Sequence, residues 1–393
     1  MIVTVILLAV LILAGVWEFT QHQKNVNAVS LRIHVNGTRG KSSVTRLIAA
    51  GMRAGGIRTL AKTTGTKPRL IFPDGTEVPI RRVGKANIIE QTMVFREAVS
   101  RGVKGIVVEC MAVQPPLQLL SEKRMVRSNI GVLTNARADH LDEMGPTIDE
   151  VARSLCSTIP KHGILFTSER ARLPIIIESG RKAECQVELA RAEDVTDEMM
   201  GGFPYLEHKD NVALALAVCR HLGIDAKTAL EGMHTYTPDP GVLRIFKVNY
   251  YQKQIEFINA FAANDPDSYG IIWELLAPHQ SAGKKLIVLV NAREDRIQRS
   301  EQMGAFIASR DADHYLLAGK HTSALASKAI ASGLSPRKIV DLGSSRAEEI
   351  FEQVLSLTPS RSLVIGIGNI VGLGEEIVTH FFNRGEEIAY RSS

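Results

Sequence analysis

Residues 29–52, VSLRIHVNGTRGKSSVTRLIAAGM, decide the fold that the sequence predicts. Residues 29–35 have the pattern of an apolar strand, and residues 44–52 have helical spacing. Between them lies the turn Gly37-Thr38-Arg39-Gly40-Lys41-Ser42. Its glycines let backbone amides face phosphate oxygens, and the following helix adds the positive end of its dipole. The stretch predicts a phosphate-binding loop that binds ATP, although a turn of this composition can also arise by chance.

Specific roles follow from the residue types in the loop. Lys41 is expected to contact the β- and γ-phosphates, and the Ser42 hydroxyl to bind Mg²⁺, with Mn²⁺ as an alternative. The loop is shorter than the usual pattern, in which a glycine stands at the place of Val35. The predicted nucleotide-binding residues of the loop are Gly37, Thr38, Arg39, Gly40, Lys41, Ser42 and Ser43.

The rest of the chain predicts two α/β domains with mostly parallel sheets. Further apolar runs at residues 105–108, 128–134 and 163–167 alternate with helical stretches, which is typical of a doubly wound sheet. A proline- and glycine-containing break follows at residues 236–241. Beyond it, a smaller Rossmann-like domain is predicted, with strands at 254–259, 285–290, 314–317, 339–342 and 362–367. We therefore place an ATP-binding domain at 29–240 and a C-terminal domain at 241–393.

The N-terminus predicts one membrane-spanning helix. Residues 2–17 are apolar or small and carry no charge, so we expect a transmembrane anchor at 1–18 and a polar spacer at 19–28. A cleaved signal peptide and a buried core helix are alternatives. Lys24 and Arg32 follow the span, and the positive-inside rule then places the catalytic domains in the cytoplasm, at the cell membrane.

The charge and cysteine content of the chain exclude few classes of function. The net charge of +5 in 393 residues suits an acidic partner, but it does not choose between a nucleotide, a polyanion and a lipid surface. The four cysteines form no CxxC pair, so we expect buried, reduced thiols.

Other polar residues are expected at the same edge of the first sheet as the loop. Glu109 ends an apolar strand, and Thr134-Asn135-Ala136-Arg137-Ala138-Asp139-His140-Leu141-Asp142 follows the next one. Ligands of parallel sheets bind at this edge, and oxygen anions suit Mg²⁺. The sequence predicts metal binding by Ser42, Glu109 and His140, although a strand-end acid alone could simply face solvent.

A basic stretch follows the loop's helix. It contains Lys62, Lys67, Arg69, Arg81, Arg82 and Lys85, with only Asp74 and Glu77 as acids, and Thr64 lies within it. Cations in such a stretch suit a polyanionic substrate. A solvated charged loop explains the pattern equally well.

The motifs GTRGKS, Glu109 and TN-x-x-x-DHLD together resemble the Mur ligase and folylpolyglutamate synthetase superfamily. Those enzymes phosphorylate a carboxylate with ATP and let an amine displace the phosphate, which forms an amide. The resemblance implies catalytic roles for Lys41, Glu109, His140 and Arg244. It also implies nucleotide contacts for Asn211, Arg244 and Asp295, and substrate contacts for Asn264 and Asp265.

The whole chain resembles the ATP-dependent ligase subunits of bacterial poly-γ-glutamate synthases. That resemblance implies an enzyme that adds glutamate to a growing γ-linked chain, with small membrane subunits as partners and no nucleic acid. One departure concerns residues 153–156, where many superfamily members carry a carbamylated lysine that holds a second Mg²⁺ and this chain has none. The alternatives are a membrane-tethered ATPase that energises polymer transport, and a ligase for another acidic amino acid.

Overall fold

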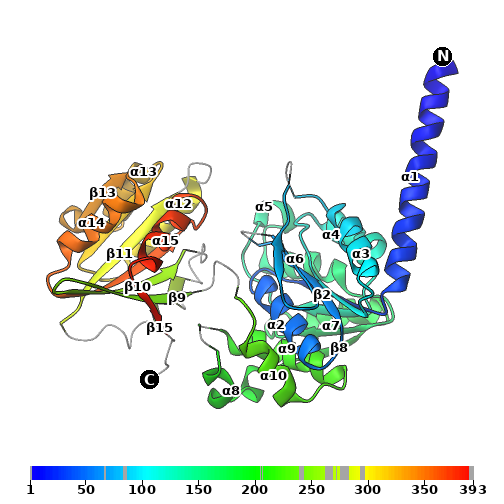
Figure 1. Cartoon of the computed structure of the whole chain (residues 1–393). Coiled ribbons are helices and arrows are strands. Elements are labelled where there is room, and N and C mark those ends of the chain that lie inside the picture. Colours follow the sequence, from blue (N-terminus) through cyan, green and yellow to red (C-terminus); the bar gives the residue numbers. More distant parts are fainter. Residues whose placement is uncertain are drawn as a thin grey trace. The chain divides into compact units, whose positions relative to one another are not determined.

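The computed structural model describes residues 2–65, 68–82, 86–203, 205, 207–238, 243–261, 269–270, 272–274, 283–292 and 297–388. Their contacts divide the chain into two units, Met1–Phe203 with Glu207–Asp239, and Pro204–Leu206 with Pro240–Ser393 (Figure 1). Each unit has its own sheet. The predicted boundary at residues 240 and 241 lies outside the described residues.

The first unit contains an eight-stranded, mostly parallel sheet with the order β4-β3-β2-β5-β1-β6-β7-β8. Only β3 runs antiparallel to its neighbours β2 and β4. The predicted apolar runs correspond to β1, β5, β6 and β7. The sequence did not predict β2, β3, β4 and β8, because these strands are short or lie at the sheet's margins. The strands are β1 (Leu31–Asn36), β2 (Thr59–Lys62), β3 (Arg69–Ile71), β4 (Glu77–Pro79), β5 (Gly105–Glu109), β6 (Ile130–Leu133), β7 (Ile164–Thr167) and β8 (Gln186–Leu189).

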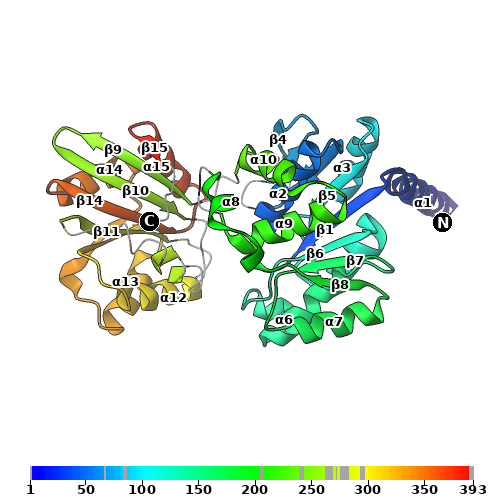
Figure 2. The ribbon, with the colours of Figure 1, turned by 90° about the horizontal axis from the view of Figure 1, so that it is seen from below.

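Helices cover this sheet. The helices α2 (Lys41–Ala54), α9 (Lys209–His221) and α10 (Ala226–His234) pack against one another, and Figure 2 shows them beside β1 and β5. The other helices are α3 (Glu90–Ser100), α4 (Pro115–Leu120), the π-helix η1 (Ser121–Val126), α5 (Leu141–Met144), α6 (Ile148–Leu155), the 3₁₀ turns η2 (Cys156–Thr158) and η3 (Ala192–Asp194), α7 (Leu173–Lys182) and α8 (Asp197–Gly201).

The second unit contains a seven-stranded sheet with the order β13-β12-β11-β14-β10-β9-β15. The pairs β9–β10 and β9–β15 are antiparallel, and the other pairs are parallel. All five strands predicted for this domain are present, and the α/β fold class is confirmed in both units. The strands are β9 (Arg244–Tyr250), β10 (Lys253–Ala260), β11 (Lys285–Ala292), β12 (His314–Gly319), β13 (Ile339–Gly343), β14 (Arg361–Gly368) and β15 (Glu386–Ile388).

Helices cover both faces of the second sheet because its strands alternate between two apolar cores. Val288 and Val290 face a core that includes residues of α12 and α13, whereas Ile287 and Leu289 face a core with α14 and α15. A short 3₁₀ turn, η5, precedes β13. The helices and the turn are α12 (Ile297–Ala308), α13 (Thr322–Ala331), η5 (Pro336–Lys338), α14 (Ala347–Leu357) and α15 (Leu373–Phe382).

The N-terminal helix α1 (Ile2–Ala28) is long and apolar enough to cross a membrane. Its apolar part is exposed, and residues 19–28, predicted as a polar spacer, continue the same helix. The last turns pack on the first unit. His22 Nε2 lies 2.9 Å from Met125 O, Val26 is buried, and Arg127 Nη1 donates to Gln23 Oε1 and Asn27 Oδ1 at 3.1 Å each. The spacer is therefore part of the folded unit.

The four cysteines are buried and free of disulfides, as the sequence predicted.

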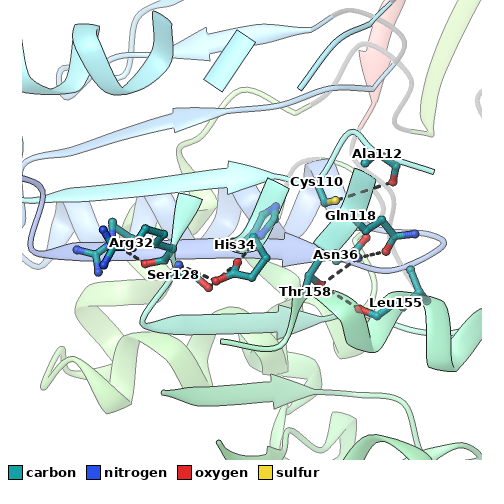
Figure 3. A network of polar contacts seen from close by, with 11 residues as sticks. Arg32, His34, Asn36, Cys110, Ala112, Gln118, Ser128, Leu155 and Thr158 are labelled. Carbon is teal, nitrogen blue, oxygen red and sulfur yellow. Dashed lines mark hydrogen bonds and ion pairs between the residues drawn. The ribbon is translucent and has the colours of Figure 1, made fainter. Parts of the chain in front are cut away.

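One face of β1 is polar although the strand is central and buried. Arg32, His34 and Asn36 share this face because alternate residues of a strand point the same way (Figure 3). Asn36 Nδ2 donates to Gln118 Oε1 at 2.9 Å and to Thr158 Oγ1 at 3.1 Å. The buried side chain of Asn36 thus finds its partners on the covering layer, as burial requires.

The pair of His34 and Glu122 forms the centre of this polar face. His34 Nδ1 lies 2.8 Å from Glu122 Oε2, and Ser128 donates to the same carboxylate through its amide and its hydroxyl. Burial opposes a charged ring, but Cys110 and Glu122 beside it raise the pKa of His34 to about 9. We infer that the His34 ring is protonated at neutral pH.

This pair makes stability depend on pH. Folded His34 has a pKa of about 9 against an ordinary value of 6.5, so its contribution is complete below pH 6.5 and is lost as the pH rises through 9. Between pH 6.5 and pH 9 we expect the free energy of unfolding to fall more in the wild type than in Glu122→Gln. The extra loss is up to about 3 kcal/mol. Urea unfolding of the detergent-solubilised chain, followed by circular dichroism, measures it. A constant difference would show that Glu122 does not raise the pKa of His34.

Candidate active site

The loop between β1 and α2 has the backbone geometry of an anion cradle. Gly37 and Gly40 adopt φ angles of 136° and 79°, which side chains disfavour. Lys41 Nζ donates to Gly37 O at 2.7 Å and to Thr38 O at 3.2 Å, so the side chain folds back over the loop. Because α2 begins at Lys41, the free amides of its first turn face the same place. The loop fits the phosphates of a nucleotide.

Residues after β6 hold the loop in this shape. Thr38 Oγ1 donates to Asn135 Oδ1 at 2.6 Å, and Arg39 N donates to the same oxygen at 3.1 Å. Thr134 Oγ1 donates to Arg39 O at 2.6 Å. The sequence placed Thr134 and Asn135 at this edge of the sheet but gave them no role of their own. Their role is to position the loop.

Ser42 and Glu109 come together as the sequence predicted for metal ligands. Ser42 Oγ donates to Glu109 Oε2 at 2.8 Å, and Thr64 N donates to the same oxygen at 2.6 Å. Glu109 lies opposite Val35 in the β1–β5 ladder and is 2% exposed. A hydroxyl and a carboxylate in contact at the loop are hard oxygen donors and fit a divalent cation.

His140 is placed differently. It precedes α5 with a φ of 47°, and its side chain is 40% exposed. Its Nε2 lies 3.9 Å from Asp139 Oδ1, and Asp139 lies 3.7 Å from Arg39 Nη2. Within the described part of the chain, no group of three or more His, Cys, Asp or Glu residues is arranged to hold a metal. A metal-binding role for His140 stays a prediction.

Asn211, predicted to contact adenine, lies against the loop. A Cβ on Gly40 would come 2.7 Å from Asn211 Oδ1. Asn211 Nδ2 donates to Glu207 Oε1 at 2.8 Å, and Tyr236 donates to the other oxygen of Glu207 at 3.1 Å. Glu207 was not among the site residues that the sequence predicted. The structure shows that it orients the amide of Asn211.

The basic stretch is partly neutralised within the protein. Lys62 is fully buried, and its Nζ lies 3.4 Å from Glu90 Oε2, while Arg82 Nε donates to Glu90 Oε1 at 2.6 Å. Burial lowers the pKa of Lys62. Arg69 and Arg81 lie outside this cluster, at the start of β3 and exposed after β4.

The remaining predicted residues belong to the second unit or are not described. Arg244 begins β9, opposite Asn259 of β10, and its Nε lies 3.6 Å from Glu387 Oε1. The predicted residues outside the described part of the chain are Lys67, Lys85, Asn264, Asp265 and Asp295.

Comparison with known proteins identifies the family. Residues 35–237 match the Mur ligase middle domain, and residues 245–384 match the poly-gamma-glutamate synthase CapB C-terminal domain. The chain is 37% identical to the capsule biosynthesis protein CapB of Bacillus anthracis, over 94% of this chain and 80% of that protein. The chain belongs to the CapB family. PGA synthase CapB of Bacillus subtilis (strain 168) is also 37% identical, over 95% of this chain and 96% of that protein.

Solved structures show the fold that the CapB family shares with other ligases. The bifunctional folylpolyglutamate synthase/dihydrofolate synthase of Yersinia pestis, complexed with AMPPNP and Mn ion, has a TM-score of 0.69 at 14% identity, with 92% of each chain covered. The folylpolyglutamate synthase of Mycobacterium tuberculosis, complexed with ADP, has a TM-score of 0.65 at 16% identity, with 95% of each chain covered. The superfamily resemblance is confirmed.

Two glycines with the same φ of 79° allow a matched test of the loop. In Gly56→Ala the new methyl group meets nothing within 4 Å, so we expect only the strain of a left-handed alanine, about 1–2 kcal/mol of stability. In Gly40→Ala the same strain is joined by a clash with Asn211, and we expect loss of ATP binding. Isothermal titration with an ATP analogue measures both variants. Equal affinities would contradict this geometry of the loop.

Proposed function

We propose that this CapB family member is an ATP-dependent amide ligase that extends a poly-γ-glutamate chain. The observation that carries the proposal is the contact of Ser42 with Glu109 beside the glycine loop, in a chain whose relatives are named CapB and PGA synthase. A further folylpolyglutamate synthase/dihydrofolate synthase of this fold has been solved with Mn, AMPPNP and L-glutamate bound, at 16% identity and a TM-score of 0.66. It supports ATP, a divalent metal and glutamate as the ligands.

The residues of the loop have distinct tasks in this reaction. The free amides from Gly40 to Ser43 and the Lys41 ammonium group bind the phosphates of ATP and offset their charge. Gly37, Thr38 and Arg39 form the rest of the loop, and their amides bond to Asn36 and Asn135. Ser42 and Glu109 would hold a divalent cation, Mg²⁺ or Mn²⁺, which neutralises charge on the transferred phosphoryl group. Asn211 and Asp295 would bind the nucleotide, and Arg244 would bind its phosphates.

The proposed reaction joins an incoming glutamate to the terminal carboxylate of the polymer. The terminal carboxylate of the polymer attacks the γ-phosphorus of ATP, which forms an acyl phosphate and releases ADP. The amine of the incoming glutamate then attacks the acyl carbon, and the C–O bond to phosphate breaks as the amide forms. Exclusion of water would protect the acyl phosphate from hydrolysis. The proposed contacts to the acidic substrates are Thr64, Lys67, Arg69, Arg81, Arg82, Asn264 and Asp265. Of these, Arg82 would contact a substrate carboxylate while it is also paired with Glu90.

Removal of the loop lysine tests the assignment. We expect Lys41→Ala to lower glutamate-dependent ADP release and polymer formation by about 100-fold or more, because a charged donor to the phosphates is lost. Lys227→Ala, an exposed lysine on α10, is the control and should keep full activity. Polymer synthesis at the wild-type rate in Lys41→Ala would refute the assignment.

The same assay separates the alternatives. A membrane-tethered ATPase would release ADP without forming an amide, and it would need no glutamate. A ligase for another acidic amino acid would form amides only when that amino acid is supplied. Analysis of the product for γ-linked glutamate therefore decides among the three functions.

We further propose that α1 anchors the chain in the cell membrane, with both catalytic units in the cytoplasm and small membrane subunits as partners. The exposed apolar surface of α1 supports this proposal. Each arginine near the centre of a span costs about 2.5–3.5 kcal/mol.

Charge placement on α1 tests the anchor. We expect the double variant Val5→Arg/Leu11→Arg to move from the membrane fraction to the soluble fraction after cell lysis. Thr20→Arg/Gln21→Arg adds the same charge after the apolar run and should stay with the membrane. The anchor is wrong if both double variants fractionate alike.

A further inference from the structure

A groove of about 1080 Å³ lies at the edge of the first sheet that is opposite the glycine loop. Its lining includes Arg32 at the start of β1, Asn129 before β6, Lys161 before β7 and Ala183 before β8. These residues all stand at the amino ends of parallel strands, whereas Gly37 follows the carboxyl end of β1. We call this feature the amino-edge groove.

The amino-edge groove is strongly cationic. Its single carboxylate, Glu122, is turned inward to His34 and Ser128. At the rim Lys182 pairs with Glu178, and His162 lies 3.5 Å from Glu184. A concave surface of one sign concentrates the electrostatic potential and attracts anions. The lysines and arginines that line the groove are Arg32, Lys123, Arg124, Arg127, Lys161 and Lys182.

Three of these cations are available to a ligand. Lys123, Arg124 and Lys161 are exposed, and nothing in the described residues forms a hydrogen bond or ion pair with their side chains. Their charges are not needed to satisfy the fold. They can therefore pair with an external anion without breaking an internal bond.

Two further cations are held rigidly close together. Arg127 bonds to Gln23 and Asn27 of α1, and Arg32 Nε donates to Arg127 O at 2.7 Å. Burial and the charge of Arg127 lower the pKa of Arg32. The charge of Arg127 thus acts on Arg32 in the free protein, and a bound anion would relieve their repulsion.

We propose that the amino-edge groove binds the already polymerised part of γ-linked polyglutamate. This proposal rests on the proposed function. The polymer carries one carboxylate per residue, and arginine and lysine side chains pair well with carboxylates. β1, a strand of six residues, separates the groove from the loop by about 20 Å. The groove therefore holds the body of the chain, while the reacting end is at the loop.

The position of α1 favours the polymer over lipid headgroups. Gln23 and Asn27 stand six and ten residues beyond Trp17, which is about 9 and 15 Å along the helix. The headgroup layer extends only about 5–8 Å beyond the hydrocarbon core. With α1 upright, Arg127 lies below the headgroups, where a chain in a groove can reach it and a flat lipid surface cannot.

Polymer binding by the full chain in zwitterionic nanodiscs tests the proposal. The test variant is Lys123→Gln/Arg124→Gln/Lys161→Gln, and the control, Lys227→Gln/Lys328→Gln/Arg337→Gln, removes the same charge from exposed residues elsewhere. Fluorescence anisotropy with a long γ-linked glutamate oligomer should show about ten-fold weaker binding for the test variant only. Ligation onto a γ-linked dipeptide should be unchanged in both, whereas the polymer made by the test variant should be shorter.

Each other outcome overturns the proposal or separates it from the proposed function. Equal oligomer affinity of the test variant and the wild type overturns it. So does a test variant that binds the oligomer normally but loses a response to anionic nanodiscs, which would identify a lipid site. If the wild type binds the oligomer through the groove but forms no amide with the dipeptide, polymer binding by the groove is supported and the proposed ligase function is refuted. Circular dichroism confirms that both triple variants are folded.

Discussion

The buried polar face of β1 is the constraint on which the first unit depends. A central strand that carries Arg32, His34 and Asn36 can be buried only if the layer above it supplies matching polar groups, because an unpaired buried charge or amide is costly. Glu122 and Gln118 supply them, from η1 and α4. Glu122 lies in the π-helix η1, and short π-helical turns are frequent at functional sites.

The same polar face connects the two edges of the sheet. At one end Arg32 and Glu122 line the amino-edge groove. At the other, Asn36 Oδ1 accepts a hydrogen bond from Gly37 N at 2.8 Å, where the glycine loop begins. η1 also receives the end of α1, through Met125 O and through Arg124 O, to which Gln23 donates at 2.8 Å. The end of α1, the groove and the glycine loop are therefore built on one strand and its covering layer.

Much of the sheet edge that carries the glycine loop could be predicted because local patterns decide it. The strand, the glycine turn and the helix are consecutive in the chain, and parallel strands bring Glu109 to the same edge as Ser42. The residues that support the site could not be predicted in this way. Asn135 bonds to Thr38 and Arg39, which lie far away in the sequence, and Lys62 resembles a solvated lysine until the fold places it beside Glu90.

The sequence by itself determined the α/β class, the glycine loop, the apolar N-terminal helix and the family, because each is written in local pattern or motif. Only the tertiary structure decided that residues 19–28 dock on the first unit, that Arg82 is paired, and that cations from β1, η1, α7 and the turn before β7 meet in one groove. The physical reason is that burial and charge pairing depend on distances between segments remote in the chain, and sequence spacing does not contain those distances.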